Sequence, residues 1–180
     1  MLNDPDFINR LRNKDEVSFN RLFSETKETI YNTALHLLQN ESEAKDVTQE
    51  VFVEVFLSID RFLDKSALST WMYRICINKS LESLRKQKRR KRFFSVANPT
   101  NEANWVHPGV VAEQKDTARK LYAAIFKLKP KEQVAFTLFH IQGFSQKQIA
   151  EIMKQSVPAV ETQIYRAKQK LSRWLINQKE

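Results

Sequence analysis

A run of 24 residues, Ser69–Arg92 (STWMYRICINKSLESLRKQKRRKR), constrains the fold of this chain more than any other segment. Its apolar residues recur at helical spacing and therefore fall on one face of a helix. These residues are Tyr73, Ile77, Leu81 and Leu84. Nine residues of the run are Lys or Arg, and Glu82 is its only acid. The segment predicts a long amphipathic helix with one buried face and one strongly basic face.

The opposite face of this helix carries side chains that suit contact with a nucleic acid. They are Trp71, Arg74, Asn78, Arg85 and Arg89. Guanidinium groups bind phosphates, an amide can pair with a base edge, and an indole can stack on a base. A basic face that is merely solvated is the alternative. Trp71 and Asn78 on the same face favour contact with a nucleic acid.

Charge is divided unevenly along the chain. Residues 1–68 carry 8 basic and 13 acidic side chains, a net of −5, whereas residues 69–92 carry +8. Residues 93–117 carry −2, and residues 118–180 again carry +8, with 12 basic against 4 acidic side chains. Two separate basic blocks indicate two contacts on one long polyanion.

A membrane surface would also attract a basic protein. However, no apolar run approaches the roughly 20 residues that span a bilayer, and no signal-peptide pattern opens the chain, so we expect a cytoplasmic protein without membrane insertion.

The composition predicts an all-α fold, because the chain has only two glycines and five prolines and is rich in Leu, Lys, Glu and Gln. The apolar periodicity predicts helices near 5–12, 15–38, 43–60 and 68–91, and then near 117–128, 130–141, 145–153 and 157–176. Residues 93–117 interrupt the periodicity with prolines, a glycine and clusters of Asn and Thr. We therefore predict two small helical domains, residues 1–92 and 118–180, joined by a flexible linker over residues 93–117. The linker's Phe93, Phe94 and Trp105 either dock on a partner or pack back on the N-terminal core.

The second and third helices have recognisable apolar stripes. In the second helix the stripe is Leu22, Phe23, Ile30, Ala34, Leu37 and Leu38. In the third it is Val47, Val51, Val55 and Phe56, and Asn40 with Glu43 predicts a capping box at the helix start. Asp46, Gln49, Glu50 and Val53 lie largely off this stripe, with Phe52 as an additional apolar residue. Such a face suits docking to another protein, although an ordinary solvated face has the same composition.

The C-terminal block has the pattern of a helix-turn-helix. Ser145 and Gln148 form a capping box, and Pro158 suits the first turn of the last helix. The apolar spacing typical of two crossing helices comes from Ile149, Ala150, Met153, Val160 and Ile164. Polar or basic residues point outward and favour DNA reading over a plain helical hairpin; they are Thr162, Gln163, Tyr165, Arg166, Lys168 and Lys170. The turn has Lys154 where a glycine with positive φ is common, at a cost of about 1 kcal/mol.

Two parts of the chain resemble the sigma-70 family of bacterial transcription initiation factors, and most closely its extracytoplasmic-function (ECF) branch. The pattern D-x-x-Q-E-x-F followed by F-x-T-W-x-Y-R-I-x-x-N belongs to conserved region 2 of that family. This chain matches it with Asp46, Gln49, Glu50, Phe52, Thr70, Trp71, Tyr73, Arg74, Ile75 and Asn78. The segment LKPKEQVAFTLFHIQGFSQKQIAEIMKQSVPAVETQIYRAKQKL resembles region 4. The resemblance covers about residues 15–92 and 118–172, in the family order.

The resemblance implies a protein that binds core RNA polymerase, at the β′ clamp helices and the β flap, and directs it to promoter DNA. The residues implied at the β′ clamp are Asp46, Gln49, Glu50, Phe52 and Phe56. Those implied at the −10 element are Asp64, Lys65, Ser66, Trp71, Arg74, Asn78, Arg85 and Arg89, with a pocket for an extruded base in the loop from Asp60 to Ser69. Those implied at the −35 element are Gln146, Glu161, Thr162, Tyr165, Arg166, Lys168 and Lys170. An anti-sigma factor is a further partner that the family allows.

The residues themselves do not indicate catalysis, a metal site or a cofactor. The single cysteine, Cys76, lies beside the apolar face of its helix and is expected to be a small buried hydrophobe. A nucleic-acid-processing enzyme would need carboxylates or a His/Cys set beside the basic face. A stand-alone helix-turn-helix regulator would account for residues 118–180 but leave the third helix and the face of Trp71 and Asn78 unexplained. Glu161 either accepts a hydrogen bond from a cytosine or pairs with a neighbouring cation.

Overall fold

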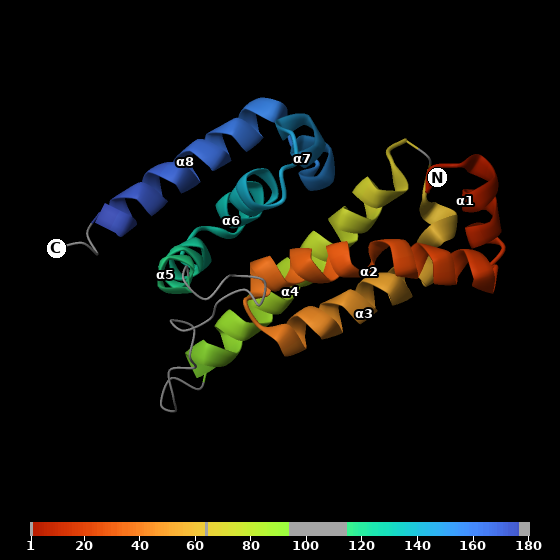
Figure 1. Ribbon diagram of the computed structural model, residues 1–180, viewed down its shortest axis with the longest axis horizontal. Coiled ribbons are helices and arrows are strands. Elements are labelled where there is room, and N and C mark those ends of the chain that lie inside the picture. The colour runs from red at the N-terminus through yellow and green to blue at the C-terminus, as the bar shows by residue number, and fades with distance from the viewer. Residues whose placement is uncertain (1, 64, 94–114, 177–180) are drawn as a thin grey trace.

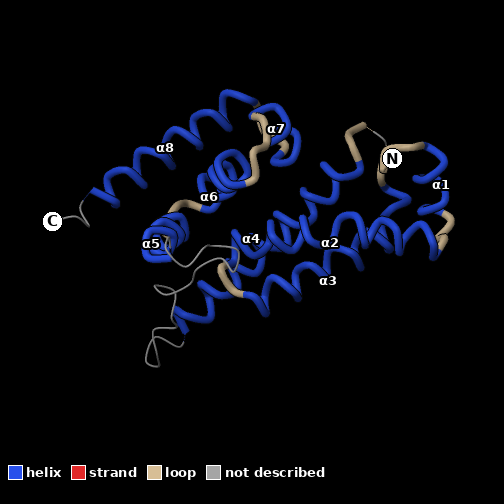
Figure 2. Tube along the Cα trace, viewed as in Figure 1, coloured by secondary structure: helices blue, strands red, loops and turns tan. Residues whose placement is uncertain are grey.

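The computed structural model describes residues 2–63, 65–93 and 115–176, which form helices joined by short turns (Figure 2). No strand forms within these ranges, and the predicted all-α class is confirmed. The predicted linker, residues 93–117, falls almost wholly outside the described residues, as do its aromatic residues Phe94 and Trp105.

The helices fall into two groups that correspond to the two predicted domains (Figure 1). The first group is α1 (Pro5–Arg12), α2 (Glu16–Leu38), α3 (Glu41–Ser58), a 3₁₀ turn at Ile59–Arg61, and α4 (Leu68–Phe93). The second is α5 (Lys115–Phe126), α6 (Pro130–Phe136), a π-helical turn at Thr137–Ile141, α7 (Gln146–Met153) and α8 (Val157–Ile176). These bounds agree with the sequence-based helices to within two residues, apart from the turns that extend α3 and α6.

Polar side chains set several of the helix starts. The carboxylate of Asp4 accepts from the backbone N–H of Asp6 at the start of α1, and that of Asp15 accepts from Ser18 at the start of α2. The hydrogen bonds with Ser18 lower the pKa of the Asp15 carboxyl group. Both hydrogen bonds of the predicted capping box of α7 form: the Ser145 side chain accepts from the Gln148 backbone N–H, and the Gln148 side chain accepts from the Ser145 backbone N–H.

The capping box predicted for α3 forms only in part. The side chain of Asn40 accepts from the backbone N–H of Glu43 at 3.0 Å, as expected. The Glu43 carboxylate instead accepts from the Ser83 hydroxyl at 2.6 Å and from the Gln87 amide at 2.5 Å, both on α4. A tertiary contact between α3 and α4 therefore replaces the local bond that the pattern indicated.

The core of the N-terminal group lies where α2, α3 and α4 pack against one another (Figure 1). Most of the predicted stripes are buried, including Leu22, Leu37, Val51 and Val55, and Cys76 is buried as expected. Two assignments to these stripes are wrong, because Phe23 and Phe56 are 45% and 43% exposed. Both rings lie where α2 and α3 pack together: Phe23 contacts Phe52 and Phe56 contacts Phe19.

The C-terminal group contains the predicted helix-turn-helix. Ile149, Ala150, Val160 and Ile164 are buried where α7 meets α8, and Ile152 is buried in addition to the partly buried Met153. Lys154 has φ 51° and ψ 51°, so it occupies the left-handed region predicted for the turn. Its backbone N–H donates to carbonyls of α7 and ends that helix.

The two groups are in contact. Buried residues of α2 and α4 and buried residues of α6, α7 and α8 belong to one continuous apolar cluster. A second, smaller cluster joins α5 to α8 around Ile125 and Leu171. Among the described residues, none of the helices is both long and apolar enough to cross a membrane.

Candidate nucleic-acid and protein interfaces

The exposed side of α3 combines polar groups with apolar ones. Asp46, Gln49 and Glu50 are exposed, as a binding role requires. Val53 and Leu57 follow one and two turns later and are 57% and 68% exposed. Large apolar side chains that are this open to water, beside carboxylates, are typical of a surface that another protein covers.

Aromatic pairs extend this surface from α3 onto α2. The Phe23 and Phe52 rings meet edge to face with centroids 4.8 Å apart, and those of Phe19 and Phe56 lie 4.9 Å apart. We call the exposed residues Phe23, Val53, Phe56 and Leu57, with partly buried Phe52, the apolar strip. Phe23 and Leu57 were not predicted to belong to this surface. The signal that could have identified them is the number of apolar residues in α2 and α3, which is larger than one buried face of each helix needs.

The basic face of α4 is exposed to solvent from Asn78 onward, whereas nearer the start of the helix its side chains contact other residues of the protein. Asn78, Arg85 and Arg89 are exposed. Trp71 is half-buried, with its ring 5.4 Å from that of Phe62. Arg74 points to the C-terminal domain, where its Nη2 donates to the Glu151 carbonyl at 2.8 Å and its Nε to the Ile152 carbonyl at 3.4 Å.

Two ion pairs border the same face. Lys79 lies 3.5 Å from Glu50 of α3, which links the basic helix to the exposed side of α3. Lys86 lies 2.9 Å from Glu82, and its hydrogen bond and charge lower the pKa of that carboxyl group. Glu82 therefore stays ionised and partly offsets the positive charge around Arg85.

The loop before α4 holds three of the predicted −10 residues. Lys65 is exposed and Ser66 is half-buried, whereas Asp64 lies outside the described residues. Asn3 fixes the end of the loop, because its side-chain oxygen accepts from the Leu68 N–H at 2.9 Å. The chain's N-terminal segment thus sets the position at which α4 begins.

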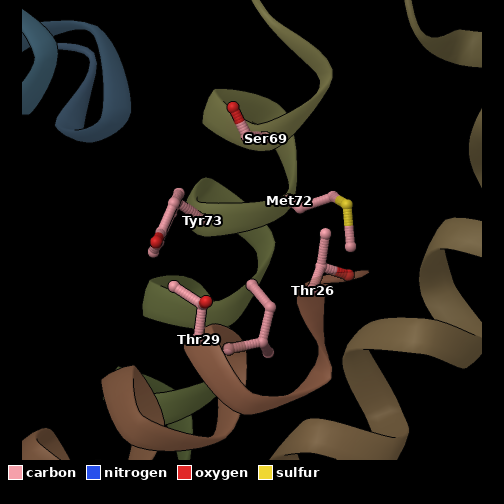
Figure 3. Close-up of a pocket in the computed structure, with 6 residues that line it drawn as sticks. Thr26, Thr29, Ser69, Met72 and Tyr73 are labelled. Atoms are coloured by element: carbon pink, nitrogen blue, oxygen red, sulfur yellow. The ribbon is translucent and has the colours of Figure 1, made fainter. Parts of the chain in front are cut away.

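A small pocket lies between α2 and the first turns of α4, next to this loop (Figure 3). Its lining is Thr26, Thr29, Ile30, Ser69, Met72 and Tyr73. Figure 3 shows the threonines of α2 opposite Ser69, Met72 and Tyr73 of α4. Among the described residues of the loop in which a base pocket was expected, Asp60 to Ser69, only Ser69 lines this pocket.

Most of the predicted −35 residues share the open face of α8. Glu161, Thr162, Tyr165, Arg166 and Lys168 are exposed, with Tyr165 at 61%. Gln146 lies in the first turn of α7 and is half-buried. Within the described residues Glu161 forms no ion pair, so the cation partner considered for it is not seen there.

Lys170 differs from the other basic residues of α8. Its ammonium lies 2.8 Å and 2.6 Å from the two carboxylate oxygens of Glu132 on α6. Glu132 is only 5% exposed. This ion pair ties α8 to α6, and it accounts for a buried carboxylate that the sequence did not reveal.

The titratable groups do not assemble into a reaction centre in the part of the chain that the structure describes. No three His, Cys, Asp or Glu side chains there converge as metal ligands. Burial raises the pKa of the Cys76 thiol to about 12, so this thiol is neither ionised nor accessible near neutral pH. The arrangement suits binding, with one exposed apolar surface and two basic helix faces.

Comparison with known proteins agrees with this arrangement. The sigma-70 region 2 model matches residues 22–90, and the sigma-70 region 4 model matches residues 118–171, together more than half of the chain. The ECF RNA polymerase sigma factor SigW of Bacillus subtilis is 28% identical over 176 residues, covering 93% of this chain and 94% of its own length. The ECF RNA polymerase sigma-E factor of Haemophilus influenzae is 28% identical over 178 residues and covers 93% of each chain.

Solved structures show the same fold. The sigma factor RpoE of Bartonella quintana, crystallised with the anti-sigma factor NepR, superposes with a TM-score of 0.69 at 19% identity, over 87% of this chain and 96% of its own. CnrH, solved with the cytosolic domain of CnrY, superposes with a TM-score of 0.69 at 22% identity, over 97% and 98%. The chain belongs to the sigma-70 family, as an RNA polymerase sigma factor of the ECF branch.

Proposed function

We propose that this sigma factor docks on core RNA polymerase through α3, contacts the −10 element through α4 and the −35 element through α8, and assists strand separation. As a sigma factor it is a promoter-specific initiation factor. The observation that carries the residue-level proposal is that one helical bundle presents the exposed apolar strip and the basic face of α4 on adjoining helices. An anti-sigma factor, such as the one described with RpoE, is a further proposed partner.

Docking on the polymerase is assigned to the apolar strip and the polar groups beside it. Val53, Phe56 and Leu57 provide apolar area whose burial contributes about 25 cal/mol per Å² before the costs of association. Asp46, Gln49 and Glu50 surround this area with hydrogen-bonding groups, which set orientation. The proposed target is the pair of β′ clamp helices, and the β flap is the proposed target of the C-terminal domain.

Contact with the −10 element is assigned to the open part of α4 and the loop before it. Arg85 and Arg89 are placed to bind phosphates, Asn78 to pair with a base edge and Trp71 to stack. Extruding a base from the duplex costs a few kcal/mol, and stacking and edge hydrogen bonds offset that cost. Strand separation would follow from capture of the extruded base near Lys65 and Ser66.

Contact with the −35 element is assigned to the exposed face of α8. In helix-turn-helix proteins the N-terminal residues of the second helix reach base edges in the major groove. Thr162, Tyr165 and Arg166 lie in the first half of α8 and are exposed, as this geometry requires. Lys168, farther along the same helix, and Gln146 at the start of α7 are placed for phosphates.

Binding to core polymerase tests the first part of the proposal with matched variants. Gln49→Ala and Val53→Glu change exposed side chains, so neither disturbs the core, and both are expected to weaken binding at least tenfold. Val17→Glu is the control, because Val17 is 76% exposed on α2 and lies outside the apolar strip. The proposal fails if all three variants bind core polymerase as the parent chain does, or if Val17→Glu weakens binding equally.

A further inference from the structure

The N-terminal segment, residues 3–14, contacts the chain on both sides of the loop that precedes α4 (Figure 1). Before the loop, Nη2 of Arg12 donates to the Phe62 carbonyl at 2.8 Å. After the loop, the side-chain oxygen of Asn3 accepts from the Leu68 N–H at 2.9 Å. The partners in these bonds are 50 and 65 residues apart along the chain, so both bonds are tertiary contacts. One short segment therefore holds both ends of the loop.

Asn3 supplies α4 with a cap that the neighbouring sequence lacks. The first N–H groups of a helix have no helical acceptor, and an asparagine oxygen is among the preferred substitutes. The residue directly before α4 is Ala67, whose methyl side chain accepts no hydrogen bond. The acceptor comes from Asn3 instead. The first turn of α4, which carries Trp71, therefore depends on the N-terminal segment for its position.

Apolar packing and a lysine hold the same region from the same side. Buried residues of α1 share one apolar cluster with buried residues on both sides of the loop; they are Phe7, Ile8 and Leu11 with Ile59, Phe62 and Leu68. The ammonium of Lys14 donates to the Phe56 carbonyl near the end of α3 and lies 3.7 Å from the Asp60 carboxylate. The Phe62 ring in turn lies 5.4 Å from that of Trp71. The contacts of α1 thus continue through Phe62 to a side chain assigned to the −10 element.

The side chains between the two anchored ends are open to solvent. Leu63 is 68% exposed, and Lys65 is exposed as well. A loop with fixed ends and exposed side chains loses little conformational entropy when it binds a ligand. Fixed ends also matter for selectivity, because a loop that shifts adapts to a wrong base as readily as to the right one. Loosening the ends is therefore expected to reduce discrimination between bases.

From these contacts we propose that Asn3 and Arg12 are positioning residues for −10 recognition: by holding the two ends of the loop before α4, they set how strictly the promoter sequence is read. Neither residue needs to contact DNA. Both lie outside residues 22–90, the part of the chain that the sigma-70 region 2 model matches. The effect on promoter reading rests on the proposed function, since it requires that the loop and α4 bind the −10 element. The anchoring of the loop does not.

Trypsin cleavage after Lys65, followed by mass spectrometry, measures the anchoring without DNA. A protease cuts such a loop when it opens locally, so the cleavage rate follows the population of the open loop. Asn3→Ala and Arg12→Ala are each expected to speed cleavage at least about fivefold, the effect of one ordinary hydrogen bond. Arg10→Ala, an exposed arginine of the same helix, is the matched control and is expected to leave the rate unchanged. Equal rates in all variants and the parent chain, or equal acceleration by Arg10→Ala, overturn the anchoring.

Transcription by core polymerase with the chain measures the effect on promoter reading. The probe is a promoter fragment that the parent holoenzyme transcribes, together with copies in which single −10 or −35 bases are changed. The readout is the ratio of transcription from the original fragment to that from a changed copy. A loss of folded protein lowers both rates and leaves this ratio intact, so the ratio separates positioning from stability.

Asn3→Ala and Arg12→Ala are each expected to lower the −10 ratio about fivefold and to leave the −35 ratio unchanged. Asn3→Asp keeps an acceptor oxygen at the same place and is expected to retain the parent ratio, as is the control Arg10→Ala. A parent-like −10 ratio in both alanine variants overturns the positioning role. So does an equal fall of the −10 and −35 ratios, or an Asn3→Asp variant that behaves as Asn3→Ala does.

Trp71→Ala and Asn78→Ala in the same transcription assay distinguish failure of the positioning role from failure of the proposed function. If these two variants lower the −10 ratio while Asn3→Ala and Arg12→Ala do not, the positioning role is wrong and the assignment of α4 to the −10 element stands. If Trp71→Ala and Asn78→Ala also leave the −10 ratio unchanged, that assignment is wrong, and the positioning role is wrong with it.

Discussion

Replacing Lys170 by Met should destabilise the C-terminal domain although half of this lysine is exposed to water. The side chain of Glu132 is 7% exposed and that of Lys170 is 46% exposed, with both carboxylate oxygens within 2.8 Å of the ammonium. Losing one partner of a fully buried pair costs about 3–5 kcal/mol. Water around Lys170 reduces this, so the expected loss in free energy of unfolding is about 2 kcal/mol.

Urea denaturation followed by circular dichroism measures this loss, and Lys168→Met is the matched control. Lys168 is exposed on the same helix and is expected to cost less than about 0.5 kcal/mol. In a Glu132→Gln background, Lys170→Met should cost at least about 1 kcal/mol less than it does in the parent chain. Equal effects of Lys168→Met and Lys170→Met, or the same cost of Lys170→Met in both backgrounds, would refute the argument that the pair stabilises α6 against α8.

Three further outcomes are expected. Lys154→Gly should raise the free energy of unfolding by about 0.5–1 kcal/mol in urea denaturation because φ is 51° there. Lys147→Gly, in the first turn of α7, should instead lower the free energy of unfolding by up to about 1 kcal/mol. Burial raises the pKa of Cys76 to about 12, so the folded chain keeps the proton that the unfolded chain loses near pH 9. Stability measured by thermal melting should therefore fall as pH rises above about 9, and a thiol reagent should react only after denaturation; rapid reaction of the native chain would contradict this. Arg166→Ala should reduce transcription from promoters that depend on the −35 element while core binding stays intact, and loss of core binding would contradict the role given to α8.

Helix positions were predictable because local signals decide them. The pairing of Ser145 with Gln148, and the left-handed turn at Lys154, both act within a few residues and both appear in the structure. The prediction that Phe23 and Phe56 are buried was wrong because it too rested on a local signal, the helical periodicity. Helical periodicity identifies which face is apolar, but it does not say how far a neighbouring helix covers the edge of that face.

Contacts between distant segments were beyond the sequence patterns. Glu43 fits a capping box by spacing, yet its carboxylate bonds to α4, and Lys170 fits a row of phosphate-binding residues, yet it pairs with Glu132. Arg74 matches the family pattern for −10 contact, and nothing in its neighbourhood along the chain indicates its bonds to α7. A polar side chain chooses among all acceptors that the fold brings within reach, and spacing along one helix reports only the local ones.

Run-off transcription tests the central claim most directly. Purified core RNA polymerase would be supplied with this chain, or left without it, on a pool of genomic promoter fragments. The account predicts specific transcripts that appear only with the chain and whose start sites reveal one shared pair of −10 and −35 sequences. Absence of any chain-dependent transcript, together with absence of a stable complex between the chain and core polymerase, would contradict it.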